Sequence, residues 1–243
     1  MFFGAIEITT DNDAITVDGN GGTLTPGDYY IYAPTAAVSF LDHLVSVMST
    51  LASPKTIAFS ISATGKVTLS CASAFTVTGW ESYAFAGYAA DALSSGTSHE
   101  ADRFLPYCWF PGIGPSDSLA PTSQQGIPVE MVSQAYAPGG TVYTSNFGET
   151  IKQVLSFQSL TKARAWNENS SDNRSFQEWW QSTLGAGREL LYVPGYLDGD
   201  ETVDHAYVAE LGQEPKPQIK RQFPGSDAYW TTKIPLIGVD ELS

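Results

Sequence analysis

Basic residues, cysteines and histidines are scarce in this 243-residue chain. Lys and Arg number 12 against 26 Asp and Glu, so the formal charge is −14. Nucleic-acid phosphates and anionic lipid surfaces are bound through Lys and Arg. The balance therefore argues against direct nucleic-acid binding and against docking on an anionic membrane.

The two cysteines, Cys71 and Cys108, form no Cys-x-x-Cys motif or Cys/His cluster. We expect two buried thiols that act as small hydrophobic side chains, with a disulfide between them as the alternative. No window of about 18 residues is free of charged and turn residues, so we expect no membrane insertion. The expected location is the cytoplasm, or an assembly built there.

Motifs of known catalytic or cofactor sites are also missing. The chain has no Gly-x-Ser-x-Gly elbow and no Walker loop. His99-Glu100 resembles part of a zinc motif, but Arg103 occupies the position where a second histidine is needed. We therefore expect no catalytic residue, no metal and no cofactor, and hence a protein that is not an enzyme. A hydrolase with paired carboxylates far apart in the sequence stays open as an alternative.

What the chain does have is apolar and aromatic residues, at 42% and 12%, enough for a folded core. The first 80 residues alternate as strands at 6–9, 14–17 and 29–32, followed by a meander at 56–62, 66–70 and 75–77. Between them Thr35 is a plausible N-cap for a helix whose apolar face is spaced by threes and fours: Val38, Leu41, Leu44, Val45, Met48 and Leu51.

The middle, residues 81–148, is rich in Ala, Gly, Ser and Pro, and its aromatics follow no period. This composition predicts long irregular loops, or an arm lying on a neighbouring subunit. The break at Pro111-Gly112-Ile113-Gly114-Pro115 suggests two domains, residues 1–112 and 113–243.

From residue 141 the pattern again predicts strands, at 141–144, 150–166, 188–194, 205–211 and 230–239. A helix capped by Ser171-Asp172 is expected between them, with an apolar face of Phe176, Trp179, Trp180 and Leu184. The expected fold class is therefore α+β and mostly β. It comprises two β-rich, sandwich-like halves, each with one packed helix, joined by a long irregular segment rich in aromatics, Gly and Pro.

Four aromatic residues are candidates for contact with a partner protein or a glycan: Tyr107, Trp109, Phe110 and Trp180. Aromatic side chains combine a large apolar area with a polar edge, which suits them to interfaces and to sugar rings. Ordinary core packing is the alternative for each of them.

The order of motifs in the first half resembles a domain of structural proteins of tailed bacteriophages. The matching stretches are Thr25-Pro26-Gly27-Asp28-Tyr29, the helix at 35–51, the strand at 64–70, Thr78-Gly79-Trp80, Ala86-Gly87-Tyr88 and Tyr107-Cys108-Trp109-Phe110-Pro111. Ala86 departs from the pattern, which usually has Leu there. The second half resembles a tail-associated β-sandwich domain, in the helix with Trp179-Trp180, the stretch 187–194 and the closing strand at 229–236.

This resemblance implies a non-enzymatic virion structural protein, most simply a tail or tail-tip/baseplate adaptor assembled in the bacterial cytoplasm. Its expected partners are itself, as a trimer or hexamer, and neighbouring virion proteins. A head decoration or connector protein is the nearest alternative. A carbohydrate-binding β-sandwich that recognises a host is the alternative from another class.

Overall fold

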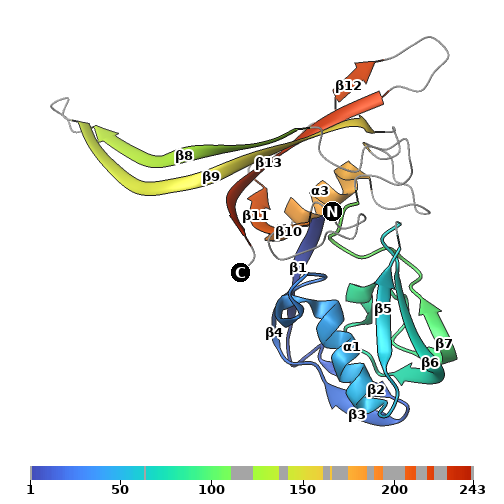
Figure 1. Ribbon diagram of the computed structural model, residues 1–243. Coiled ribbons are helices and arrows are strands. Elements are labelled where there is room, and N and C mark those ends of the chain that lie inside the picture. The colour runs from blue at the N-terminus through green and yellow to red at the C-terminus, as the bar shows by residue number, and fades with distance from the viewer. Residues whose placement is uncertain are drawn as a thin grey trace.

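The computed structural model describes residues 2–62, 64–110, 123–136, 142–160, 165, 175–184, 189–193, 206–211, 218–221 and 229–241. The fold is α+β and mostly β, as predicted: two antiparallel sheets, with one α-helix packed on each (Figure 1). The predicted domain boundary at residues 112 and 113 lies outside the described residues.

The smaller sheet is built from the N-terminal part of the chain. Its strand order is β3-β2-β6-β5, and β7 pairs with β6. The strands are β2 (Ala14–Val17), β3 (Asn20–Thr23), β5 (Ile57–Ile61), β6 (Val67–Thr78) and β7 (Leu93–Glu100). The turn between β2 and β3 uses Asp18 and Gly19 at φ of 51° and 81°, the left-handed pair that a tight hairpin needs.

Helix α1 (Phe40–Leu51) covers this sheet with the face that the sequence predicts, and Leu41, Leu44 and Met48 are fully buried. The predicted cap at Thr35 is wrong. Thr35 precedes a short 3₁₀ turn, Ala36–Val38, and its side chain makes no capping bond. Ser39 then takes an extended conformation and accepts a hydrogen bond from the Asp42 amide at 3.4 Å, so the α-helix begins four residues later than Pro34-Thr35 suggested.

The larger sheet has the strand order β4-β1-β10-β11-β13-β9-β8, and β12 pairs with β13. Its strands are β1 (Phe2–Ile8), β4 (Gly27–Tyr30), β8 (Ser123–Tyr136), β9 (Val142–Leu160), β10 (Leu190–Tyr192), β11 (Tyr207–Leu211), β12 (Gln218–Arg221) and β13 (Tyr229–Glu241). Strand β1 joins the two ends of the sequence, because residues 2–4 pair with β10 and residues 5–8 pair with β4.

Strand β1 contributes side chains to two separate cores. Phe3, Ile6 and Ile8 belong to the core under α1, whereas Phe2 belongs to a second core on the larger sheet. The second core also contains β-strand residues and α3 (Phe176–Leu184). Each buried Phe, Ile or Leu side chain of these cores contributes about 1.5–3 kcal/mol relative to exposure.

Helix α3 begins with a capping box at Ser175. The Ser175 hydroxyl accepts a hydrogen bond from the Glu178 amide at 3.3 Å, and the Glu178 carboxylate accepts one from the Ser175 amide at 3.0 Å. The predicted cap at Ser171-Asp172 lies outside the described residues, and the cap that the structure does describe stands immediately before Phe176.

The middle segment is more regular than its composition predicts. It contains β7, β8 and the start of β9, where irregular loops were expected. Parts of this segment are rich in Gly and Pro, which have a weak propensity for β-strands. Strands form there nevertheless, because pairing with neighbouring strands outweighs that weak propensity. Strand β12 was likewise missed, because prolines surround it in the sequence.

Candidate functional site

The four predicted contact residues do not form one exposed patch. Trp109 and Phe110 are fully buried and Trp180 is 4% exposed, while Tyr107 is half-buried. In the single chain the side chains of Trp109, Phe110 and Trp180 therefore pack in the core, which was the alternative interpretation of these residues. Contact with a partner or glycan stays a prediction only for Tyr107.

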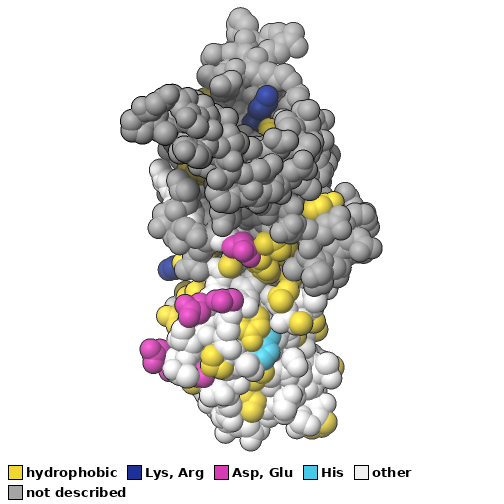
Figure 2. Space-filling view, turned by 90° about the vertical axis from the view of Figure 1, so that its left-hand side faces the viewer, with side chains coloured by type: hydrophobic (Ala, Val, Ile, Leu, Met, Phe, Trp, Pro, Cys, Tyr) yellow, Lys and Arg dark blue, Asp and Glu magenta, His cyan; other side chains and the backbone are white. Residues whose placement is uncertain are grey.

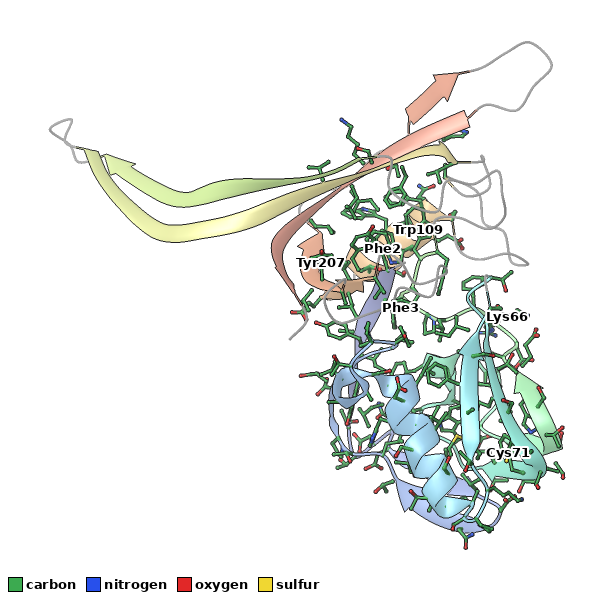
Figure 3. The ribbon with its side chains drawn as sticks, in the orientation of Figure 1. Phe2, Phe3, Lys66, Cys71, Trp109 and Tyr207 are labelled. Atoms are coloured by element: carbon green, nitrogen blue, oxygen red, sulfur yellow. The ribbon has the colours of Figure 1, made fainter. Side chains whose placement is uncertain are left out.

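Trp109 is the centre of the second core. Its ring stacks on Trp179 of α3, with ring centroids 5.5 Å apart and planes at 19°, and it is also stacked with Phe2 at 5.9 Å. Phe2 and Trp109 also exchange backbone hydrogen bonds, both 3.0 Å long. Figure 3 shows both side chains directed into the space between α3 and the larger sheet. This contact joins the first strand of the chain to α3.

Tyr107 positions that cluster through its backbone. It has a φ of 58°, a left-handed conformation that is strained for a tyrosine. Its carbonyl oxygen accepts a hydrogen bond from Trp179 Nε1 at 3.0 Å. Gly4 of β1 lies against it, and a β-carbon on Gly4 would come within 2.6 Å of the Tyr107 β-carbon. The segment is therefore closely fitted between β1 and α3.

The most unusual feature of the larger sheet is a two-stranded ribbon at its edge. Strand β9 pairs with β13 only as far as Lys152, whereas its pairing with β8 continues to Val142, opposite Tyr136. Residues 128–136 and 142–151 thus form a hairpin without a third strand among the described residues. We call this part the projecting ribbon; it is about 30 Å long at 3.3 Å per residue. In Figure 1 it extends to the left, away from the other described elements.

A two-stranded ribbon is marginally stable at best in water, so the projecting ribbon is suited to gaining a neighbour. Its outer strand, β8, presents backbone N–H and C=O groups that no described strand uses. Natural sheet edges are commonly protected by lysine or proline. The projecting ribbon has no Lys or Arg, and its one proline, Pro128, lies at its base. The edge of β8 is therefore suited to pairing with a strand from another molecule.

A cleft of about 890 Å³ lies between the smaller sheet's side of the molecule and α3. Arg103, Phe104 and Asp102 line one part of it, and Glu178 and Gln181 of α3 line another. One Asp102 oxygen accepts a hydrogen bond from the Ala89 amide at 2.9 Å, and one Glu178 oxygen belongs to the capping box. The remaining polar atoms could bind a small molecule rich in hydroxyl groups.

The described residues contain no cluster of metal-binding type. No three His, Cys, Asp or Glu side chains there come together as metal ligands. His99, which the sequence paired with Glu100, instead packs edge-on against Phe75 at 4.8 Å. Cys71 and Cys108 form no disulfide; the first is half-buried and the second is buried. None of the helices in the described part of the chain has the length and apolarity to cross a membrane.

His43 has a structural role. Its Nε2 accepts a hydrogen bond from the Thr25 amide at 2.9 Å, and its ring stacks on Tyr29 with planes at 7°. Burial lowers the pKa of this histidine below its ordinary value. The neutral ring therefore holds the segment before β4 against α1.

Neither the projecting ribbon nor the cleft was predicted from the sequence. A signal for the ribbon exists: Ala137-Pro138-Gly139-Gly140 is a turn signal between two runs rich in Val, Tyr, Thr and Phe. The cleft has no comparable signal, because its lining residues are about 75 positions apart in sequence.

Comparison of the chain with protein-family models, with curated proteins and with solved structures returned no match.

Proposed function

We propose that this protein is a non-enzymatic structural component of a tailed-bacteriophage virion. Its place there is that of a tail or tail-tip/baseplate adaptor that assembles with copies of itself, as a trimer or hexamer, and with neighbouring virion proteins. The projecting ribbon is the observation that carries this proposal. A two-stranded ribbon that extends beyond its own sheet is stabilised when a strand of a second subunit pairs with it.

Two further observations support an assembly role. The large aromatic core that joins β1, Trp109 and α3 packs this helix on the sheet that carries the ribbon. The surface is acidic, as the face in Figure 2 illustrates over the N-terminal part of the molecule. Net negative charge keeps free subunits soluble before they assemble.

The test is the mass of the purified chain in solution, measured by light scattering over a wide range of concentrations, with electron microscopy of the same samples. We expect a discrete trimer or hexamer. In a matched variant, residues 129–150 are replaced by Asn-Gly, which shortens the ribbon but leaves the pairing of β9 with β13 in place. This variant should stay monomeric while keeping the circular-dichroism spectrum of a folded β protein.

A chain that remains monomeric at every concentration would contradict the self-assembly part of the proposal. An oligomer that forms equally well with the shortened ribbon would show that the ribbon is not the element that carries it.

The cleft favours a second candidate function, carbohydrate binding, for a host-recognition role. An aromatic side chain beside a guanidinium and carboxylates matches the apolar faces and hydroxyl groups of a sugar. Saturation-transfer NMR against a panel of bacterial-surface monosaccharides tests it. Binding should disappear in Phe104→Ala and persist in Phe59→Ala, whose ring contacts Tyr32 outside the cleft. No saturation transfer from any sugar would remove this candidate.

A further inference from the structure

The sheet that carries the projecting ribbon has an open edge at β8 and another at β12, toward opposite ends of β13. Trp230 of β13 pairs with Leu160 of β9 and also with Ile219 of β12, so β9 and β12 lie on opposite sides of β13. Counted from β12, the strands follow the order β12-β13-β9-β8, with β12 and the ribbon part of β8 at different levels along them. Within the described part of the chain, the outer side of β8 and the outer side of β12 have no strand partner.

The strand directions make these two edges compatible. Each neighbouring pair, β12 with β13, β13 with β9 and β9 with β8, is antiparallel. It follows that β8 runs opposite to β12. A second copy with the same strand direction would bring its β12 beside the first copy's β8 as an antiparallel neighbour. The alternation of strand directions then continues from one subunit to the next without a break.

The charges of the two edges are complementary. The projecting ribbon contains two charged residues, Glu130 and Glu149, and they are directly opposite each other in the β8–β9 register. Like charges at facing positions destabilise a strand pair. Strand β12 contains Lys220 and Arg221 and no acidic residue, in a chain that has only 12 basic residues. A neighbouring β12 would supply the positive charge that the ribbon lacks.

We propose that copies of this chain assemble head to tail, with the ribbon's β8 edge of one copy pairing with the β12 edge of the next. This inference rests on the proposed self-assembly and names the surfaces that perform it. Because the two surfaces differ, the contact is heterologous: it builds a closed ring if the rotation between copies closes, and a filament if it does not.

The register also fixes the displacement between copies. Lys152 lies opposite Ile237, so Glu149 lies level with about residue 240 of β13, whereas β12 lies opposite residues 229–231. Bringing Glu130 beside Lys220 thus displaces each copy by about ten residues, or about 33 Å, along the strands. A ribbon about 30 Å long spans that displacement.

Charge reversal tests this pairing. One variant carries Glu130→Lys and Glu149→Lys; it keeps a like-charge pair in the hairpin, so the ribbon's own stability is little changed. The other carries Lys220→Glu and Arg221→Glu on β12. Each variant alone should need at least a tenfold higher protein concentration to assemble at about 50 mM salt, where surface charges are weakly screened. A control with Glu7→Lys and Asp11→Lys, both at exposed positions, should assemble as the native chain does.

Mixing the two reversed variants is the decisive experiment. In an equimolar mixture, alternating copies place every ribbon against a β12 of opposite charge, so a hexameric ring or a filament should assemble at close to the native concentration. Two variants cannot alternate around a trimer, so for a trimer the four substitutions are combined in one chain, which restores opposite charges at every contact. Either recovery also shows that the variants are folded. The pairing is overturned if either single variant assembles like the native chain, or if the mixture (for a trimer, the combined chain) does not recover. If the native chain itself never assembles, the proposed self-assembly fails, and this inference fails with it.

Discussion

At the scale of single residues, Ser39 sets where α1 begins. Its hydroxyl satisfies one of the free amides of the first helical turn, that of Asp42. We expect Ser39→Ala to lower the free energy of unfolding by about 1 kcal/mol, measured by urea denaturation. Thr35→Ala is the matched control, because the Thr35 side chain makes no capping bond. An equal loss in both variants would contradict the assignment of the cap.

Gly87 is the glycine that the fold most requires. It has a φ of 83°, and a β-carbon there would come within 2.4 Å of the Arg103 carbonyl oxygen. Gly19 has a similar φ of 81° but nothing within 4 Å of its β-carbon position. Gly19→Ala should cost about 1–2 kcal/mol from backbone strain alone. Gly87→Ala should cost about 1–3 kcal/mol more, because the backbone must also move. Thermal unfolding of the two variants, side by side, measures the difference.

His43 makes the stability of the fold depend on pH. Burial depresses its pKa in the folded state, so the unfolded chain binds the proton more readily. The stabilising effect of the neutral ring is fully present above the unfolded-state pKa of about 6.5 and is lost as the pH falls through the lower folded-state value. Unfolding free energies of the native chain and of His43→Phe, at pH 7.5 and at 5.5, test this. The native chain should lose more stability between these values than the variant does, and equal losses would contradict the role.

At the scale of whole elements, the sequence predicts those whose periodicity is strong. The face of α1 with Leu41, Leu44 and Met48 and the face of α3 with Phe176 and Trp179 were both predicted correctly. Elements whose stability comes from pairing with distant strands were not. β8 and β12 contain Gly, Pro or charged residues, and only their register with β9 and β13 makes them strands.

The candidate contact residues and the projecting ribbon likewise depend on parts of the chain that are distant in sequence. Aromatic content identified Trp109 and Trp180 as notable, but composition cannot tell an exposed ring from a buried one. That distinction depends on Phe2, which comes from the far end of the chain to cover Trp109. The projecting ribbon became recognisable only when the register showed where β13 stops pairing with β9.

Helix α3 contacts the rest of the molecule through Phe176 and the indole of Trp179, which also makes a hydrogen bond. Trp179 is fully buried and donates its Nε1 hydrogen to the Tyr107 carbonyl oxygen. Trp179→Phe should keep part of the apolar contact but remove this hydrogen bond, at a cost of about 0.5–1.5 kcal/mol. Hydrogen exchange should accelerate in α3 and β9 before it does in α1, whose core is separate. Uniform acceleration over the molecule would contradict this separation of the two cores.

At the scale of the whole molecule, the acidic ribbon and the basic β12 predict that assembly weakens with salt. Raising the salt from about 50 mM to about 500 mM shortens the screening length from more than 10 Å to less than 5 Å. Sedimentation should show the oligomer dissociating over this range. An interface held by apolar burial alone would keep its mass or gain strength, and that outcome would contradict a charge-matched contact.

The double pairing of β1 also bears on how the chain is synthesised. β1 leaves the ribosome well before its partner β10, which begins at residue 190, so residues 2–4 can pair with β10 only after most of the chain between them has been translated. Contacts so distant in sequence form slowly. A product of interrupted translation that stops before β10 would expose the edge of β1 and the phenylalanine at position 2, both of which promote aggregation and degradation. The closing of β1 onto β10 therefore acts as a check on completeness, since only chains translated past residue 190 can form the sheet that carries the ribbon.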